Sequence, residues 1–302
     1  YAQIEEEVRE VLGMPKPEEH MANYPWTRPC LVGVAAREGG DLQDADFEAI
    51  VQARLEAVKV NRDTSIPTIN RLRETSSEIF LLAQIFHLLG DGVDWSAAAW
   101  IDAVRQDLDR LYRADVRYFE LQRLPNIQQF GWNRFWYSGE VFGEWWLEVF
   151  QTLRGEYPEA RFGFPGVMPG GQVPGRRLDA QVFLDGADPA MLEADWLGAV
   201  CYWNSAAGRE SEEEGRFYEV IRRRYPEKLL FITEFGNTNQ HLRAAAKGEE
   251  YQGYYQRLRE VPGIGAAFAQ VVSSASGYDA LVWRSERGEL NEIALQVGKR
   301  EN

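Results

Sequence analysis

Eight short apolar segments recur along the chain, and most of them are followed by a stretch with helical periodicity. Continuous apolar runs of this kind are typical of strands buried on both faces of a parallel sheet. The segments lie at 31–36, 57–61, 79–86, 118–122, 161–164, 196–203, 229–237 and 266–272. The clearest helical patterns lie at 96–112, 140–153 and 243–260. This repeat predicts an α/β fold, a single (β/α)8 TIM barrel.

A doubly wound open sheet is the alternative fold. It would normally carry a Gly-rich phosphate turn after its first strand, and 32–40 contains no G-x-G-x-x-G. The length of 302 residues suits one barrel, so 1–302 is expected to be a single domain. Residues 1–28 are expected to form an extension that packs on the barrel, with a lead-in helix at 2–12.

Two further helical segments are predicted with less regular patterns. The acidic run 212–214 is expected to open a helix that closes with the basic run 222–224, an order that complements the helix dipole. Helical patches are also expected at 178–184 and 189–194.

The charge and the cysteine usage narrow the partners and the compartment. A formal net charge of −14 argues against nucleic acid or an anionic membrane as a partner. No window approaches a membrane span, and Glu5–Glu7 occupy the place where a signal peptide is basic and then apolar. Cys30 and Cys201 are expected to be free thiols, which suits a reducing compartment. A cytoplasmic monomer is therefore expected, unless a processed signal has been removed.

Neither a metal nor an organic cofactor is expected. The three histidines, His20, His87 and His241, lack metal-ligand spacing. The ten tryptophans and thirteen tyrosines are the unusual feature of the composition. Aromatic side chains fill cores, but they also line clefts that stack against sugar rings.

The predicted ends of the strands supply the candidate functional residues. In a barrel these ends meet at one rim, the C-terminal mouth, where a saccharide or another small molecule is expected to bind. Glu234 is the carboxylate placed at a strand tip, whereas Asp63 lies later in a loop and is a weaker candidate; a helix-capping role is the alternative for Glu234. The candidate ligand-binding residues are Ala35, Asn61, Gln84, Gln122, Arg123, Leu124, Val200, Tyr202, Trp203 and Trp283.

Strand alternation directs Glu120 and Gln122 into the barrel. A buried carboxylate needs a partner, and Lys59 on the second strand is the obvious one. A structural Glu120–Lys59 ion pair is therefore predicted.

The segment Ile232-Thr233-Glu234-Phe235-Gly236 resembles the strand 7 motif of retaining glycoside hydrolases built on (β/α)8 barrels. The resemblance spans nearly the whole chain. It implies that Glu234 occupies the position of the nucleophile and that Tyr202 orients it. It also implies that Trp283 is an aromatic platform for the sugar.

The strand 4 motif of that family is broken here. The family pattern reads Asn-Glu-Pro-Asn, whereas this chain has Arg123-Leu124-Pro125-Asn126. Retaining hydrolysis needs two carboxylates about 5 Å apart, and leucine cannot protonate a leaving group. Val200 and Ala35 also replace polar residues of the family. The shared direction of these changes indicates a site redesigned, by divergence or by engineering, into a largely apolar pocket.

The expected function is therefore that of a glycosidase scaffold with Glu234 as a lone carboxylate, acting as a general base or as a ligand-binding group. Desolvation would raise the pKa of Glu234 and improve a base, whereas a nearby Arg123 would hold the carboxylate ionised. The sequence leaves both outcomes open. One alternative is an active glycoside hydrolase that takes its acid from elsewhere, for example Asp63. Another is a non-catalytic carbohydrate-binding protein.

Overall fold

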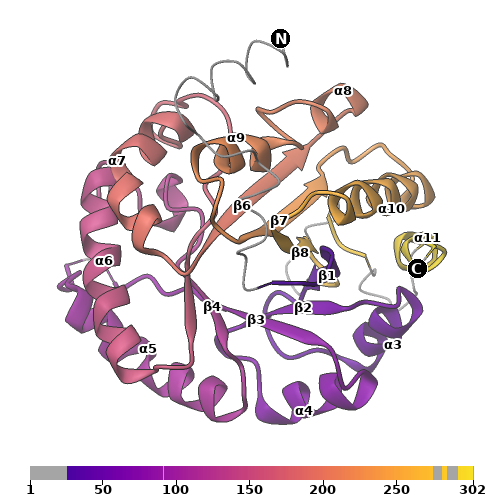
Figure 1. Cartoon of the computed structure of the whole chain (residues 1–302), viewed down its shortest axis with the longest axis horizontal. Helices are drawn as coiled ribbons and strands as arrows, with labels where there is room; N and C mark the ends of the chain where they lie inside the picture. Colours follow the sequence, from indigo (N-terminus) through magenta and orange to yellow (C-terminus); the bar gives the residue numbers. More distant parts are fainter. Residues whose placement is uncertain (1–25, 91, 275–280, 284–291, 302) are drawn as a thin grey trace.

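The described part of the chain is a closed parallel barrel. The computed structural model describes residues 26–90, 92–274, 281–283 and 292–301. Each strand pairs in parallel with the next, and β8 closes on β1 (Figure 1). The strands are β1 (Leu31–Ala35), β2 (Ala57–Asn61), β3 (Phe80–Ile85), β4 (Tyr118–Leu121), β5 (Arg161–Phe164), β6 (Trp196–Trp203), β7 (Leu230–Asn237) and β8 (Ile264–Ala269). The predicted (β/α)8 barrel is confirmed, and the open-sheet alternative is wrong.

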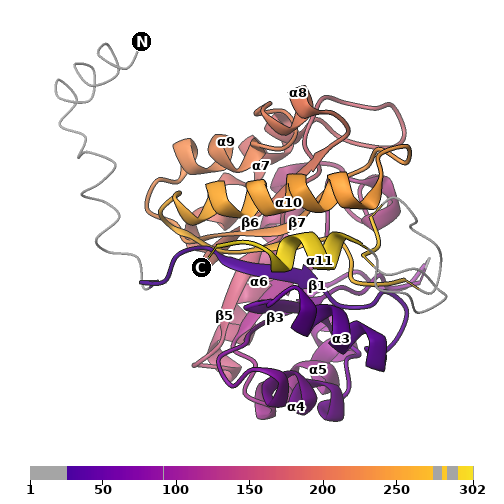
Figure 2. The same cartoon turned by 90° about the vertical axis from the view of Figure 1, so that its right-hand side faces the viewer.

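Helices surround the sheet as an outer layer, which the side view in Figure 2 shows for α3, α10 and α11 against the strands. Several begin at a serine whose hydroxyl accepts a backbone N–H, as Ser65, Ser96 and Ser138 do, which stabilises the first turn. The helices are α3 (Asp44–Gln52), α4 (Ile66–Thr75), α5 (Ala97–Arg113), α6 (Gly139–Glu156), α7 (Ala180–Glu193), α8 (Ala206–Arg209), α9 (Phe217–Arg224), α10 (Ala244–Arg259) and α11 (Glu292–Gly298).

Two helix predictions need correction. The patches at 178–184 and 189–194 belong to one helix, α7, which contains Pro189. The acidic run 212–214 does not open a helix, because α9 begins only at Phe217. The predicted helix at 2–12 lies outside the described residues.

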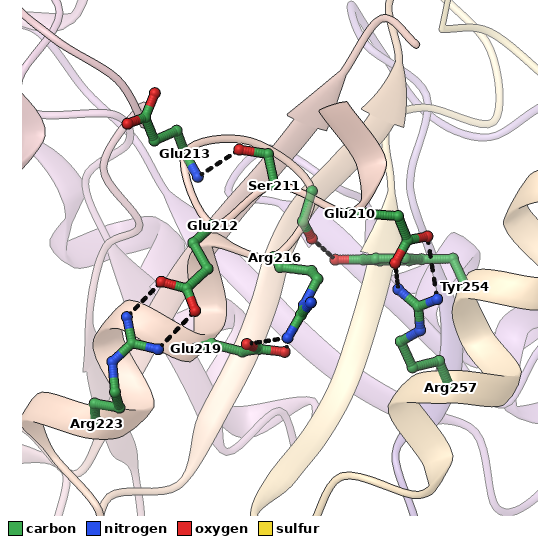
Figure 3. A network of polar contacts seen from close by, with 10 residues as sticks. Glu210, Ser211, Glu212, Glu213, Arg216, Glu219, Arg223, Tyr254 and Arg257 are labelled. Carbon is green, nitrogen blue, oxygen red and sulfur yellow. Dashed lines mark hydrogen bonds and ion pairs between the residues drawn. The ribbon is translucent and has the colours of Figure 1, made fainter. Parts of the chain in front are cut away.

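The acidic run is instead held in turns by side chains, as Figure 3 shows. Glu212 accepts hydrogen bonds of 2.8 and 2.6 Å from Arg223, and the Ser211 hydroxyl accepts one from the Glu213 N–H. Gly215 lies so close to α8 that a Cβ there would come within 2.4 Å of the Arg209 carbonyl oxygen. The chain therefore packs back on α8 at this glycine, and α9 begins only after it, at Phe217.

β7 contains one extra residue relative to its neighbour β6. Ile232 is opposite Ala199 of β6 and Glu234 is opposite Val200, so that Thr233 is the extra residue of a β-bulge. Regular alternation would place Glu234 on the same face as Ile232, which lies in the layer between sheet and helices. The bulge instead turns Glu234 into the barrel, while the next residue, Phe235, packs outside.

An aromatic cluster fills the barrel interior at the N-terminal ends of the strands. Phe80 and Phe231 stack at 5.4 Å, and Tyr118 packs against both rings. Trp26 lies edge-on to all three. An apolar layer therefore lies at this end of the barrel interior, and the buried polar side chains described below lie toward the other end. None of the described helices is long and apolar enough to cross a membrane.

Candidate functional site

Glu234 lies at the centre of a buried polar network at the C-terminal end of the barrel. Arg123 donates two hydrogen bonds to it, from Nε to Oε1 at 2.6 Å and from an Nη to Oε2 at 3.1 Å. The Tyr202 hydroxyl donates to Oε2 at 2.9 Å, and Lys59 Nζ donates to Oε1 at 3.3 Å. The Glu234 side chain is only 2% exposed. Both of its oxygens are therefore engaged, and the structure brings two of the candidate residues, Arg123 and Tyr202, together beside it.

The charges around Glu234 decide its protonation state. Burial by itself would raise the pKa of this carboxyl group, but the positive charges of Arg123 and Lys59 and the hydrogen bonds of Arg123 and Tyr202 outweigh burial and lower the pKa to about 2. Burial and the charge of Glu234 hold the pKa of Tyr202 well above 10, so its hydroxyl stays a donor. Of the two outcomes that the sequence left open, the ion pair prevails. A carboxylate with so low a pKa is a weak base near neutral pH.

A second buried carboxylate lies next to this network. Lys59 Nζ is 3.5 Å from Glu120, and Gln84 donates a 2.8 Å hydrogen bond to the same carboxylate. The predicted Glu120–Lys59 pair is confirmed, but Lys59 also contacts Glu234. One cation on β2 therefore joins the carboxylates of β4 and β7.

A cavity of about 370 Å³ opens above the network, at the mouth of the barrel. We call it the mouth pocket. Its lining residues are Glu38, Gly39, Asn61, Arg62, Asp63, Gln84, Phe86, Arg123, Gln129 and Phe130. The lining is mostly polar and charged, contrary to the expectation of a largely apolar pocket. Those polar groups come from the ends of β2 and β3 and from the loops after β1, β2 and β4, whereas the expectation of an apolar pocket rested on Ala35, Leu124 and Val200.

Three of the predicted ligand-binding residues line the mouth pocket: Asn61, Gln84 and Arg123. The Asn61 amide donates a 2.9 Å hydrogen bond to the Arg37 carbonyl, which fixes its orientation. Arg123 lies between the pocket and Glu234, and its guanidinium is 5.1 Å from the centre of the Phe130 ring. Glu234 itself does not line the pocket, because Arg123 covers it.

Other predicted residues are placed where they support the network or the core. Gln122, with a φ of 76°, leaves the strand and hydrogen-bonds through both amide atoms to the His87 main chain. Trp203 donates to Glu250 and stacks on Phe235, and it is 1% exposed. The remaining predicted residues are all buried, at 5% exposure or less, and none lines the mouth pocket: Ala35, Leu124, Val200 and Trp283.

Several residues of the mouth pocket were not among the predicted candidates. Glu38, Arg62 and Phe86 lie shortly after β1, β2 and β3, while Gln129 and Phe130 lie in a short 3₁₀ helix (Gln128–Phe130) in the loop after β4. The available signal was their place, since loops that follow the strands of a barrel form its mouth. Among the described residues, no cluster of three or more His, Cys, Asp or Glu side chains could hold a metal ion.

Solved glycoside hydrolases share this architecture. An endo-β-1,3-glucanase of glycoside hydrolase family 128 (subgroup II) from Sorangium cellulosum matches with a TM-score of 0.62 and 16% identity over 90% of this chain and 99% of that one. The corresponding enzyme from Pseudomonas viridiflava has a TM-score of 0.59 and 13% identity over 91% and 99%. A curdlan-specific exo-β-1,3-glucanase from Blastomyces gilchristii, solved with glucose, has a TM-score of 0.59 and 13% identity over 89% and 97%.

These comparisons and the barrel together define the fold as a (β/α)8 barrel similar to that of these glycoside hydrolases. At these identities the likeness establishes a shared fold, which confirms the structural side of the resemblance read from the sequence. No protein-family model matches the chain, and no curated protein matches it either.

Proposed function

We propose that this protein is a non-hydrolysing saccharide-binding member of the glycosidase fold, with its ligand in the mouth pocket. The observation that carries the proposal is the bidentate ion pair between Arg123 and Glu234, with Nε 2.6 Å from Oε1 and an Nη 3.1 Å from Oε2. This pair, with Lys59 and Tyr202, consumes the hydrogen-bonding capacity of the carboxylate that a retaining glycosidase would use as nucleophile.

The second carboxylate of a retaining mechanism is also missing from its expected place. Leu124 stands at the acid position of the family motif and is buried. Glu120 is buried under Lys59 and Gln84 and does not line the mouth pocket. Asp63 lines the pocket, but Arg123 separates the pocket from Glu234. An active hydrolase with Asp63 as its acid is therefore less favoured.

The mouth pocket has the chemistry that suits a sugar. Its volume lies within the range of about 300–1,000 Å³ that is common for ligand sites. Asn61, Gln84 and Gln129 offer amide donors and acceptors for hydroxyl groups, while Phe86 and Phe130 lie edge to face at 5.5 Å. Aromatic rings beside hydrogen-bonding groups are a common arrangement for binding a ligand with both apolar and polar faces. The glucose in one of the similar structures supports the same class of ligand.

Two measurements test the proposal. Isothermal titration calorimetry with β-linked gluco-oligosaccharides is expected to show binding that Asn61→Ala weakens, with Asn70→Ala, which changes an exposed asparagine of α4 outside the pocket, as the matched control. Mass spectrometry after incubation with an activated 2-fluoroglycoside is expected to show no covalent adduct on Glu234. An adduct would establish a nucleophile and overturn the non-hydrolysing reading, while the absence of heat with every oligosaccharide would overturn saccharide binding.

A further inference from the structure

A second cavity adjoins the mouth pocket and carries charge of one sign. It has a volume of about 580 Å³, and we call it the distal groove. Its lining residues are Ile127, Gln128, Gln129, Met168, Val173, Arg176 and Arg177. Gln129 lines both cavities, so the distal groove continues the mouth pocket across this exposed side chain.

The walls of the distal groove are fixed by a buried asparagine. Asn126, in the loop after β4, is fully buried, and its amide donates to the carbonyls of Met168 and Leu178 at 2.8 and 3.1 Å. Its side-chain oxygen accepts from the Met168 N–H at 2.9 Å. The Gln128 N–H also donates to the Arg176 carbonyl at 2.9 Å. The loops after β4 and β5 are therefore held together, and the groove is formed before any ligand arrives.

Two arginines give the groove its charge. Arg176 is exposed, and no described residue forms an ion pair with it or with Arg177. Arg177 donates through Nε to the Gly171 carbonyl at 3.0 Å, which orients its guanidinium. The lining includes no carboxylate, and the nearest acidic side chain in the sequence, Asp179, caps α7 by accepting from the Val182 N–H. In a chain with a net charge of −14, this is a local concentration of unpaired positive charge.

We propose that the distal groove binds the acidic groups of an anionic saccharide chain whose neighbouring units occupy the mouth pocket. This proposal rests on the proposed saccharide binding and narrows its ligand to chains that carry carboxylate or sulfate groups. Arginine suits these groups because its planar guanidinium binds oxyanions with two parallel hydrogen bonds. A preformed wall lowers the entropic cost of ordering such a contact.

The test compares two hexasaccharides of the same linkage by isothermal titration calorimetry: β-1,3-linked glucose, and the same chain with its C6 hydroxyl groups oxidised to carboxylates. At low ionic strength the oxidised chain is expected to bind about tenfold more tightly, a difference of about 1.4 kcal/mol. The double variant Arg176→Ala/Arg177→Ala should remove this preference, so that both chains bind with the same affinity. Arg113→Ala, which changes an exposed arginine on α5, should keep the preference.

The outcomes separate the two proposals. Equal binding of both chains to the unmodified protein would overturn the anionic groove and leave saccharide binding intact. A preference that survives the double variant would also overturn the assignment to Arg176 and Arg177. Failure of both chains to bind would overturn both proposals together. A third hexasaccharide, which carries sulfate esters on its C6 hydroxyl groups in place of carboxylates, distinguishes the two sources of negative charge.

Discussion

Arg123 covers Glu234, with its side chain 17% exposed and that of Glu234 only 2% exposed. The Glu234 carboxylate of β7 therefore faces a guanidinium where a glycosidase nucleophile would face a sugar. Because the pair is buried, its two members depend on each other. A buried ion pair of this kind contributes little against an apolar replacement of both partners, but removing one partner leaves an uncompensated charge.

Replacing Arg123 with methionine should destabilise the protein by about 3–5 kcal/mol, since the Glu234 carboxylate would lose two hydrogen bonds and its closest positive charge. Urea unfolding measures the change in the free energy of unfolding. Arg113→Met is the control, because that side chain is 81% exposed and its nearest carboxylate is 3.9 Å away. The control should stay within about 0.5 kcal/mol of the unmodified protein. A loss below 1 kcal/mol in Arg123→Met would contradict the prediction.

The stability of the protein should fall as the pH drops from about 4.5 to about 2. The pKa of Glu234 is lowered in the folded state from 4.5 to about 2, so the unfolded chain takes up this proton first on acidification. The stabilisation is complete above pH 4.5 and disappears as the pH passes the folded pKa; its size is on the order of 3 kcal/mol. Glu234→Gln lacks this group, so its unfolding free energy should depend less on pH in that window. Parallel slopes for the two proteins would refute the assignment.

Restoring the strand 4 motif should produce hydrolytic activity. In the variant Arg123→Asn/Leu124→Glu the cover over Glu234 is removed and a second carboxylate stands at the acid position. General acid catalysis is worth roughly 10²–10⁴ in rate. The matched variant Arg123→Asn/Leu124→Gln has the same size and no acid. Cleavage of a β-gluco-oligosaccharide, whose leaving group needs a proton, is expected to be faster in the first variant by about this factor. Equal rates in two variants that circular dichroism shows to be folded would disprove the role assigned to position 124.

The exposed Glu212–Arg223 ion pair before α9 should contribute less to the free energy of unfolding than the buried Arg123–Glu234 pair. Arg223 and Glu212 have side chains that are 51% and 44% exposed, although their hydrogen bonds are short (Figure 3). Exposed pairs are screened by solvent and contribute about 0–1 kcal/mol. Glu212→Gln should therefore cost less than about 1 kcal/mol, and the cost should shrink in 1 M salt. A cost of several kcal/mol in thermal unfolding would show that the loop depends on this pair.

Most of the strands could be predicted from the sequence because their apolar runs are uninterrupted. The predicted bounds of β2, β5 and β6 agree with the structure, and β8 begins two residues earlier than expected. The start of α9 was predicted wrongly because a charge order that suits a helix dipole also suits turns held by side-chain pairs. Glycines at close approaches, such as Gly215, decide between the two, and their neighbours are distant in sequence or belong to another element.

The candidate site was predictable only in part. The strand-end rule located Tyr202 and Arg123, which lie at the C-terminal ends of predicted strands, and Glu234, although β7 continues for three residues beyond it to Asn237. It could not show that Lys59 contacts two carboxylates, since that depends on how three strands are staggered around the barrel. The strand-end rule also could not show that Gln122 turns toward His87, because nothing in the sequence indicates that this glutamine adopts a positive φ.

The bulge at Thr233 has a consequence for how this site could change. It acts as a phase shift within β7: residues before it and after it follow opposite parities. Deletion of this one residue would make Glu234 follow Ile232 directly, so regular alternation would keep the Glu234 carboxylate inside the barrel and Phe235 against the tyrosines of α10. The face that Glu234 occupies is therefore set by its register opposite Val200 of β6, and the extra residue of β7 is accommodated without changing that face.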